Sequence, residues 1–350
     1  MQHNWQHKIS HHAQLGGIET AVLDNGPGRG SRVAWVNTGA GLRFKVLIDR
    51  AMDIAEAFHD RHSLAWLSCT GHPLPAPAPT GGLSWLHTFG GGLLTTCGLS
   101  HIGGPETDGF GDRGLHGAIS NTAAELVSVI QPDLAAGRAD MQLTGIVRET
   151  RVLGVHLEMK RTINARIGVP VIKISDEITN RGNTPAPHML MYHMNFGWPL
   201  ADEGSRLLWE GEWTARDEAS KSIFREGGDF KTCPAPMAEH AGAGEAAAVI
   251  DIKAAEDGWC IAGLHNPQLE LATVVRFKKS QLPWFTNWQH WGHGEYVTGL
   301  EPCTHPPIGQ AAARENGTLI FLQPGESRRY DLEIEVLEGR DEIKKIFHDE

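Results

Sequence analysis

Three separate segments of this sequence carry side chains that can exchange protons with a ligand. His116 lies in a Leu-His-Gly turn and His193 lies in a predicted strand. Glu301 is predicted to end another strand, which Pro302 stops. Glu301 has an apolar and glycine context instead of a charge run, which predicts a partly desolvated carboxylate. Such a carboxylate can act as a general base near neutral pH, and an imidazole can act as the acid. The three residues predict acid and base chemistry that needs no cofactor.

The segment 186–200 contains two histidines, and strand parity separates them. His193 and Asn195 are two residues apart and share one face of a regular strand, whereas His188 points to the opposite face. A lone histidine is more often a buried structural residue than a functional one. We therefore predict a structural role for His188 and a place in the site for His193 and Asn195.

Aromatic and planar polar side chains are concentrated just before Glu301. Flat apolar rings pack against C–H faces of a small ligand, and planar polar groups bind its hydroxyls. Packing in the core is the alternative for the aromatic residues. Arg50 and Asp53 are candidate hydroxyl ligands, with an internal salt bridge as the alternative. The side chains before Glu301 are Trp284, Asn287, Trp288, Gln289, His290, Trp291 and His293.

A metal site is an alternative to metal-free acid and base chemistry. His116, His193 and Glu301 together would be an acceptable triad for a divalent cation. The sequence has 19 histidines but no H-E-x-x-H motif, so the pattern excludes a zincin. We predict no metal and no cofactor.

The elements that position these residues are predicted to be strands, because apolar and polar residues alternate in short runs throughout. The clearest run is 330–336, where apolar residues take the even positions and acidic residues the odd ones. Many short strands, 41 glycines and 19 prolines predict an all-β protein built as a large antiparallel β-sandwich. Further strands are expected at 32–38, 43–49, 141–149, 155–163, 169–178, 249–253, 259–264, 269–277 and 318–322.

Three segments interrupt the strands. Residues 72–82 are predicted to form a proline-stiffened loop, and 234–248 a second surface excursion. The glycine-rich stretch 81–117 is too irregular for a strand and is predicted to be a long ordered loop that builds a site. The predicted organisation is an N-terminal extension (1–19), a single domain (20–338) and a C-terminal tail (339–350).

Composition limits the partners of the chain. The formal charge of -11 disfavours nucleic acid and anionic membrane surfaces, since both require a basic face. The five cysteines include no C-x-x-C pair, which indicates reduced thiols. The N-terminal residues predict no signal peptide, and no apolar run is long enough to span a membrane. We expect a cytoplasmic protein with a small-molecule partner.

Several motifs resemble those of the aldose 1-epimerases, also called galactose mutarotases. In chain order, the three that carry chemistry are Leu115-His116-Gly117, Tyr192-His193-x-Asn195-Phe196-Gly197 and Gly299-Leu300-Glu301-Pro302. Two more resemble a divergent bacterial branch of this superfamily, and the resemblance spans roughly residues 20 to 338. These are Asp49-Arg50-x-Met52-Asp53-Ile54 and Gly91-Gly92-Leu93-Leu94-x-Thr96-Cys97-Gly98-Leu99.

The resemblance implies a galactose mutarotase-like supersandwich with a sugar cleft across one sheet. It implies an isomerase that interconverts the anomers of a free or phosphorylated sugar, with Glu301 as base, His193 as acid and His116 beside the acid. Ring opening needs a proton taken from O1 and a proton given to the ring oxygen. A metal-dependent sugar isomerase, epimerase or lyase and a non-catalytic carbohydrate-binding protein are the alternatives. The candidate sugar ligands are Arg50, Asp53, Asn195, Trp288 and His293.

Overall fold

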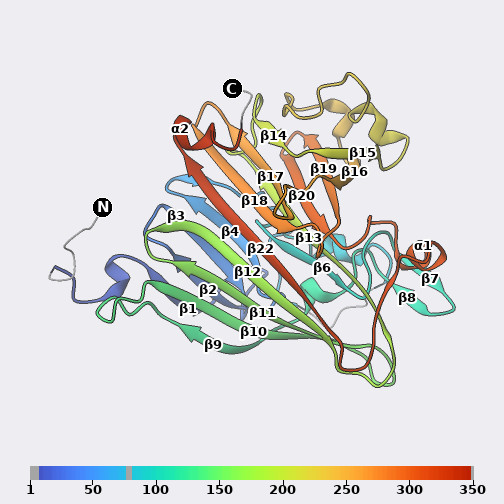
Figure 1. Ribbon diagram of the computed structural model, residues 1–350, viewed down its shortest axis with the longest axis horizontal. Coiled ribbons are helices and arrows are strands. Elements are labelled where there is room, and N and C mark those ends of the chain that lie inside the picture. Colours follow the sequence, from blue (N-terminus) through green and yellow to red (C-terminus); the bar gives the residue numbers. More distant parts are fainter. Residues whose placement is uncertain (1–7, 76–80, 348–350) are drawn as a thin grey trace.

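The computed structural model of the protein describes residues 8–75 and 81–347. Strands in antiparallel sheets make up most of the regular structure in these residues (Figure 1). No helix in the described part of the chain has the length and apolar character needed to cross a membrane. Its helical segments are η1 (His12–Gln14), η2 (Ser84–His87), η3 (Ile119–Asn121), η4 (Ala219–Ser222), η5 (Ala238–His240), α1 (Gln310–Glu315) and α2 (Arg340–Ile343).

The largest sheet has eight strands, with β22 and β12 adjacent near its centre (Figure 1). In β22 the apolar residues from Tyr330 to Val336 are buried, and the acidic residues between them are more exposed. The alternation predicted for 330–336 is therefore confirmed, and one face of the sheet packs while the other meets water. The order of strands is β14 (Arg206–Leu208), β17 (Trp259–Asn266), β18 (Leu271–Lys278), β22 (Ser327–Glu338), β12 (Val169–Asn180), β11 (His156–Arg166), β10 (Asp140–Thr150) and β9 (Glu125–Ile130).

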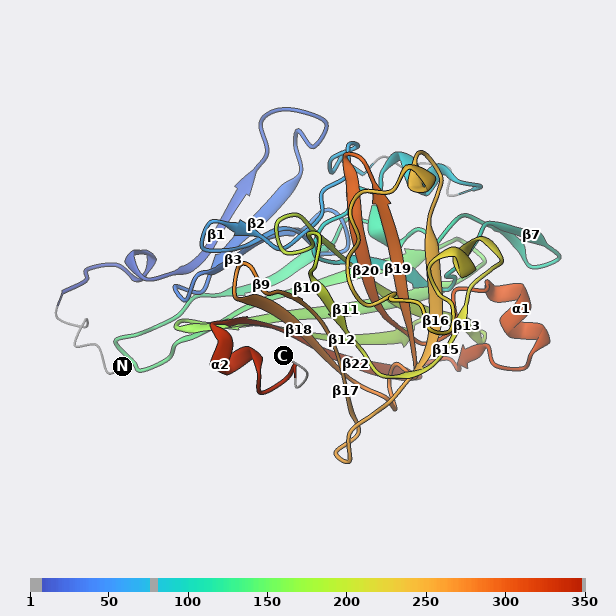
Figure 2. The same ribbon diagram turned by 90° about the horizontal axis from the view of Figure 1, so that it is seen from above.

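A seven-stranded sheet carries His193 and Glu301. Its strands run at a steep angle to those of the eight-stranded sheet (Figure 2). Its order is β15 (Gly211–Ala215), β16 (Ala246–Ile252), β19 (Trp284–Gly292), β20 (Glu295–Cys303), β13 (Ala186–Gly197) and β21 (Ile320–Leu322), with β6 (Thr95–Leu99) also paired to β13.

The main hydrophobic core lies between the facing apolar sides of these two sheets. It includes Ile174 and Leu332 from the eight-stranded sheet and Met194 and Leu300 from the seven-stranded sheet. A five-stranded sheet adds residues such as Phe44 to the same core. The strands outside the two large sheets are β1 (Gly17–Val22), β2 (Arg32–Asn37), β3 (Leu42–Leu47), β4 (Asp53–His59), β5 (His62–Ser63) and the hairpin β7 (Glu106–Asp108) and β8 (Gly111–Arg113).

The predicted all-β antiparallel sandwich is confirmed. The division into extension, domain and tail stays a prediction; β1 begins at Gly17, inside the predicted extension, and β22 ends at Glu338. Residues 76–80 of the predicted proline-rich loop lie outside the described residues.

Two local predictions are wrong. The glycine-rich stretch 81–117 contains β6, a fully buried strand, because its residues pair with β13 and are covered on both faces. Pro302 does not end the strand that holds Glu301, since β20 continues to Cys303. Proline lacks an N–H, and it is tolerated there because the ladder between β13 and β20 has no bridge between Leu300 and Cys303.

Candidate active site

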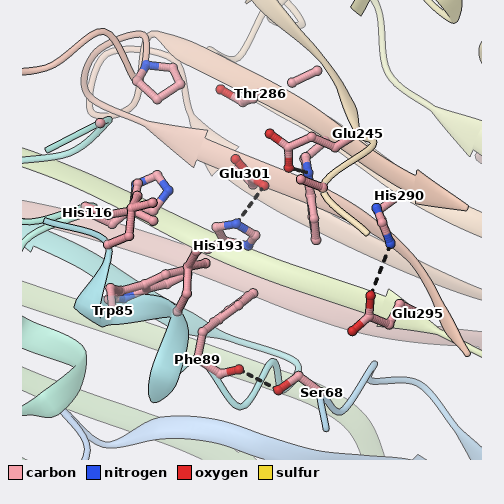
Figure 3. A pocket seen from close by; sticks show the side chains of 18 of the residues that line it. Ser68, Trp85, Phe89, His116, His193, Glu245, Thr286, His290, Glu295 and Glu301 are labelled. Carbon is pink, nitrogen blue, oxygen red and sulfur yellow. Dashed lines mark hydrogen bonds and ion pairs between the residues drawn. The ribbon is translucent and has the colours of Figure 1, made fainter. Parts of the chain in front are cut away.

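Strand register makes Glu301 and His193 neighbours. Antiparallel β13 and β20 pair Met194 with Leu300, so the residue before Met194 lies opposite the residue after Leu300. Residues directly opposite each other share a face of the sheet. Nε2 of His193 lies 3.3 Å from Oε1 of Glu301, and Figure 3 shows the two side chains together. We call these two residues the acid–base pair.

The same face of the sheet continues from the acid–base pair across β19 and β16. Thr286 of β19 pairs with Glu301, and Trp288 pairs with Gly299 two positions earlier on β20. Ala247 of β16 pairs in turn with Trp288. These alternate positions form the floor of a pocket of about 710 Å³, which both members of the acid–base pair line.

The long loop after residue 81 supplies a wall of this pocket, as its predicted role requires. Trp85 of η2 stacks on Phe89 with ring centroids 4.1 Å apart, and its Nε1 donates a hydrogen bond of 3.1 Å to Ser120. The Phe89 ring lies 5.2 Å from the His193 ring. Trp288 approaches the same imidazole from the floor, at 5.5 Å. The imidazole of His193 is therefore enclosed by aromatic rings.

His116 enters the pocket from a constrained turn. Its φ of 56° lies in the left-handed region, which histidine adopts more readily than most residues. Its Nδ1 accepts a hydrogen bond of 3.3 Å from the N–H of Gly103, so the proton of the neutral ring is on Nε2. The ring lies 5.9 Å from that of His193. Burial, and next His193, hold the pKa of His116 well below its usual value, so this side chain is a neutral hydrogen-bond donor.

Two glycines beside these residues permit close approaches. A Cβ at Gly117 would meet the carbonyl oxygen of Gly98, so this glycine lets two backbone segments approach each other closely. A Cβ at Gly299 would meet the Glu301 carboxylate and lie 3.2 Å from Cβ of Trp288. The missing side chain at 299 therefore leaves the space in which the carboxylate lies.

Burial sets the protonation of the acid–base pair. Glu301 is 2% exposed, and its pKa is raised well above the usual value by burial and then by the Glu245 carboxylate, with Arg216 opposing. Burial also lowers the pKa of His193 to about 4. Between these two pKa values the pair holds one proton, and burial favours the neutral arrangement with that proton on Glu301.

Glu245 is the charged neighbour that the sequence reading missed. Its Oε1 lies 2.8 Å from Nη2 of Arg216, and its Oε2 accepts a hydrogen bond of 2.6 Å from Nε1 of Trp288. It follows the alanine- and glycine-rich run 241–244, part of the segment predicted as a surface excursion, so no local signal indicated a role. Trp66 and Trp85 were missed for the same reason, since single aromatic residues in loops carry no period.

Arg50 and Asp53 were predicted as sugar ligands, and the structure places both outside the pocket lining. Arg50 donates hydrogen bonds to the backbone carbonyls of Pro73 and Thr88. Asp53 lies 3.0 Å from Nη1 of the buried Arg161. The alternative of an internal salt bridge thus describes Asp53, whereas Arg50 is held by hydrogen bonds to backbone carbonyls.

Asn195 and His293 also lie outside the pocket lining. Asn195 shares the face of His193, but its Nδ2 donates to the carbonyl of Gly92, which covers it. His293 is exposed in the turn between β19 and β20. His188 is buried, with Nε2 2.7 Å from the Tyr330 hydroxyl, so its predicted structural place is confirmed. Of the predicted ligands, Trp288 lines the pocket.

The metal triad considered above is not formed. Within the described ranges, the one group of three potential ligands whose ligand atoms all lie within 4.8 Å of one another is His59, Asp60 and Glu338. That group lies at the ends of β4 and β22, outside the pocket. His116 and the acid–base pair are too widely spaced for a common ion.

Fold and site together define a galactose mutarotase-like β-sandwich with a buried carboxyl and imidazole in a pocket on one sheet. A family model described as a domain of unknown function, DUF4432, matches residues 28–336, and the chain belongs to this family. No curated protein matches the chain.

Solved structures of aldose 1-epimerase-like proteins share the fold of this chain. The chain is similar to a Klebsiella pneumoniae protein provisionally named aldose 1-epimerase, with 25% identity and a TM-score of 0.87 over 96% of this chain and 89% of that one. A galactose mutarotase-like protein from Clostridium acetobutylicum shares the fold at 12% identity, with a TM-score of 0.61 over 92% and 98% of the two chains. Galactose 1-epimerase from Lactobacillus acidophilus also shares the fold at 11% identity, with a TM-score of 0.58 over 92% of this chain and 99% of that one. The resemblance predicted from the motifs is confirmed.

Proposed function

We propose that the protein is an aldose 1-epimerase-like isomerase, which interconverts the anomers of a sugar by opening and closing its hemiacetal ring. The observation that carries the proposal is the contact of 3.3 Å between Nε2 of His193 and Oε1 of Glu301 in an aromatic-walled pocket. Oε1 of Glu301 is buried and has no hydrogen-bond partner among the described residues. Buried polar atoms of this kind are rare, and a bound hydroxyl would satisfy them.

The single proton of the acid–base pair is sufficient for ring opening. In the reactive arrangement the shared proton has moved from Glu301 to His193, so Glu301 takes the proton of O1–H while the imidazolium gives its own to the ring oxygen. The C1–O bond to the ring oxygen then breaks, and O1 becomes the carbonyl oxygen. Rotation about C1–C2 exposes the other face of the carbonyl, and the reverse transfers close the ring as the other anomer. Each positioned proton transfer contributes typically ~10² to 10⁴ in rate.

His116 supports this step without exchanging a proton. Because Gly103 donates to its Nδ1, its Nε2–H is available to a sugar oxygen beside the acid–base pair. Trp85 lies 5.0 Å from the His116 ring and limits its movement. A fixed neutral donor of this kind stabilises charge that develops on the ring oxygen as the C1–O bond breaks.

Anomer exchange measured by saturation-transfer NMR on a panel of aldoses tests the proposal. The native protein is expected to accelerate exchange of at least one sugar, and Glu301→Gln to lose about 10²- to 10⁴-fold of that acceleration. Glu212→Gln changes an exposed carboxylate of β15 in the same way and serves as the matched control. A folded native protein that accelerates no sugar contradicts the proposal, and equal activity in Glu301→Gln contradicts the assigned base.

A further inference from the structure

The pocket extends well beyond the acid–base pair. His290 and Glu295 line it too, with Nε2 of His290 3.5 Å from Oε2 of Glu295. Figure 3 shows these two residues on one side and His116 with the acid–base pair on the other. Glu295 is the first residue of β20, and Glu301 follows it six positions later on the same strand. Six residues of a strand span about 20 Å. The pocket is therefore longer than one sugar ring.

The volume of the pocket leads to the same conclusion. A single hexose displaces about six or seven water molecules, roughly 200 Å³ at ~30 Å³ each. The pocket holds about 710 Å³. A hexose at Glu301 would leave most of this space to water.

The middle of the pocket offers surfaces that suit a second ring. Trp288 and Trp66 lie edge to face there, with ring centroids 6.3 Å apart. Trp288 lies between His193 and His290, with ring centroids 5.5 Å and 6.3 Å from theirs. The exposed Leu83 and Leu86 line the pocket elsewhere. Aromatic and aliphatic groups of this kind pack on the C–H faces of a sugar. Past Trp288, beside His290, the Glu295 carboxylate can accept hydrogen bonds from hydroxyls.

The charges of the pocket exclude an anionic ligand. Among the described residues that line it, Arg216 is the only arginine or lysine. Its guanidinium already lies 2.8 Å from carboxylate oxygens of Asp217 and Glu245. The other charged side chain that lines it, Glu295, is acidic, and Glu301 is a neutral acid. A phosphate or a sugar carboxylate would therefore be desolvated beside carboxylates, with no free cation to pair with it.

We propose that the substrate is an uncharged reducing disaccharide, an inference that rests on the proposed function and names its substrate class. Only the reducing ring carries a free O1 hydroxyl, so this ring lies at Glu301 and His193. The second ring then lies over Trp288 and reaches toward His290 and Glu295. The sequence predicted a free or a phosphorylated sugar, and of these two we propose the free sugar.

The test compares kcat/KM for anomer exchange of glucose, galactose and glucose 6-phosphate with that of maltose, cellobiose and lactose. At least one disaccharide is expected to exceed both monosaccharides by about 10-fold or more, the effect of one or two added contacts. Glucose 6-phosphate is expected to be the poorest substrate. A monosaccharide that equals or exceeds every disaccharide overturns the inferred size, and a preference for glucose 6-phosphate overturns the inferred charge.

A variant of Glu295 tests where the second ring lies. Glu295→Gln is expected to lower the ratio of disaccharide to monosaccharide kcat/KM by about 10-fold, the effect of one weakened hydrogen bond. Glu212→Gln, on exposed β15, is expected to leave the ratio unchanged. An unchanged ratio in Glu295→Gln contradicts the placement of the second ring.

Binding separates failure of this inference from failure of the proposed function. Trp66, Trp85 and Trp288 line the pocket, so intrinsic tryptophan fluorescence reports sugar binding without turnover. If no sugar is turned over but maltose, cellobiose or lactose binds more tightly than glucose, the isomerase proposal fails and the ligand class stands. If none of the six sugars is turned over or bound, both are refuted.

Discussion

The proton shared by Glu301 and His193 is controlled by burial and by one neighbouring ion pair. Burial moves the two pKa values in opposite directions, so the state with one proton is maintained over the pH range between them. Glu245 and Arg216 act on Glu301 with opposite signs. When the surroundings of two titratable groups move their pKa values apart, one group can serve as the acid and the other as the base.

We predict a bell-shaped pH dependence of kcat/KM with its alkaline limb set by Glu301. Below about pH 4 His193 is also protonated and the pair has no base, and above the raised pKa of Glu301 the pair has lost its proton. Glu245→Gln removes a negative charge that raises this pKa and leaves Arg216, which lowers it. The alkaline limb is therefore expected to move to lower pH. An alkaline limb that stays in place or moves to higher pH, in profiles measured beside Glu212→Gln, would refute this account.

At the scale of elements, the pocket is a consequence of register. Period-two alternation predicts the faces of single strands, which is why the parity of His188 and His193 could be predicted from the sequence. Register between β13 and β20 joins residues about a hundred positions apart, and alternation within one strand does not specify it. The resemblance of the motifs to a known family predicted that Glu301 and His193 share a site; the pattern of neither strand predicted it.

The prediction of Arg50 and Asp53 as ligands failed for a related reason. The partner of Asp53 is Arg161, on a strand far along the chain, and a buried partner of this kind leaves no local signal. The strands β4 and β9 were also not predicted. β9 is partly exposed at the edge of its sheet, and β4 is almost wholly buried, so neither position favours regular alternation of apolar and polar residues.

Gly299 tests the contribution of close strand packing to the site. In Gly299→Ala the added methyl group meets the Glu301 carboxylate and displaces it from its present position. A displacement of about 1 Å is enough to lower kcat/KM about 10²-fold. Gly109→Ala is the matched control, because nothing lies within 4 Å of a Cβ built there. Anomer exchange and thermal unfolding of both variants are the measurements; native activity in Gly299→Ala would show that the carboxylate does not need this space.

At the scale of the whole molecule, a buried ionic network ties the sheets together beneath the pocket. Arg161 of β11 donates two hydrogen bonds to Asp176 of β12 and one to Asp53 of β4. The hydroxyl of Tyr192 on β13 donates to Asp176 at 2.7 Å. The network thus links the eight-stranded, five-stranded and seven-stranded sheets. Its member on the seven-stranded sheet, Tyr192, directly precedes His193.

Arg161→Leu is expected to destabilise the protein by about 3–5 kcal/mol, because two buried carboxylates lose their common cation. Arg166→Leu is the matched control on the same strand. Its side chain is 51% exposed and pairs with an exposed Asp140, so its loss is expected to cost about 1 kcal/mol or less. Denaturant unfolding of both variants measures the difference, and similar losses in the two would contradict a structural role for the network.

The buried carboxyl of Glu301 also makes the stability of the whole protein depend on pH. Its pKa is raised in the folded state, mainly by burial, so folding disfavours its ionised form. The stability that such a group contributes is complete below its unfolded pKa of ~4.3 and is lost as the pH rises through the folded pKa. In Glu301→Gln the side chain at this position cannot ionise, so the variant does not lose this stability as the pH rises.

The Tm of Glu301→Gln is therefore expected to exceed that of the native protein by a margin that grows from about pH 5 toward pH 9. Other titrating groups are common to both proteins and cancel in the difference. Thermal unfolding at matched ionic strength measures it. A margin that is constant across this range would mean that Glu301 titrates alike in the folded and unfolded states, and the one-proton mechanism would lose its physical basis.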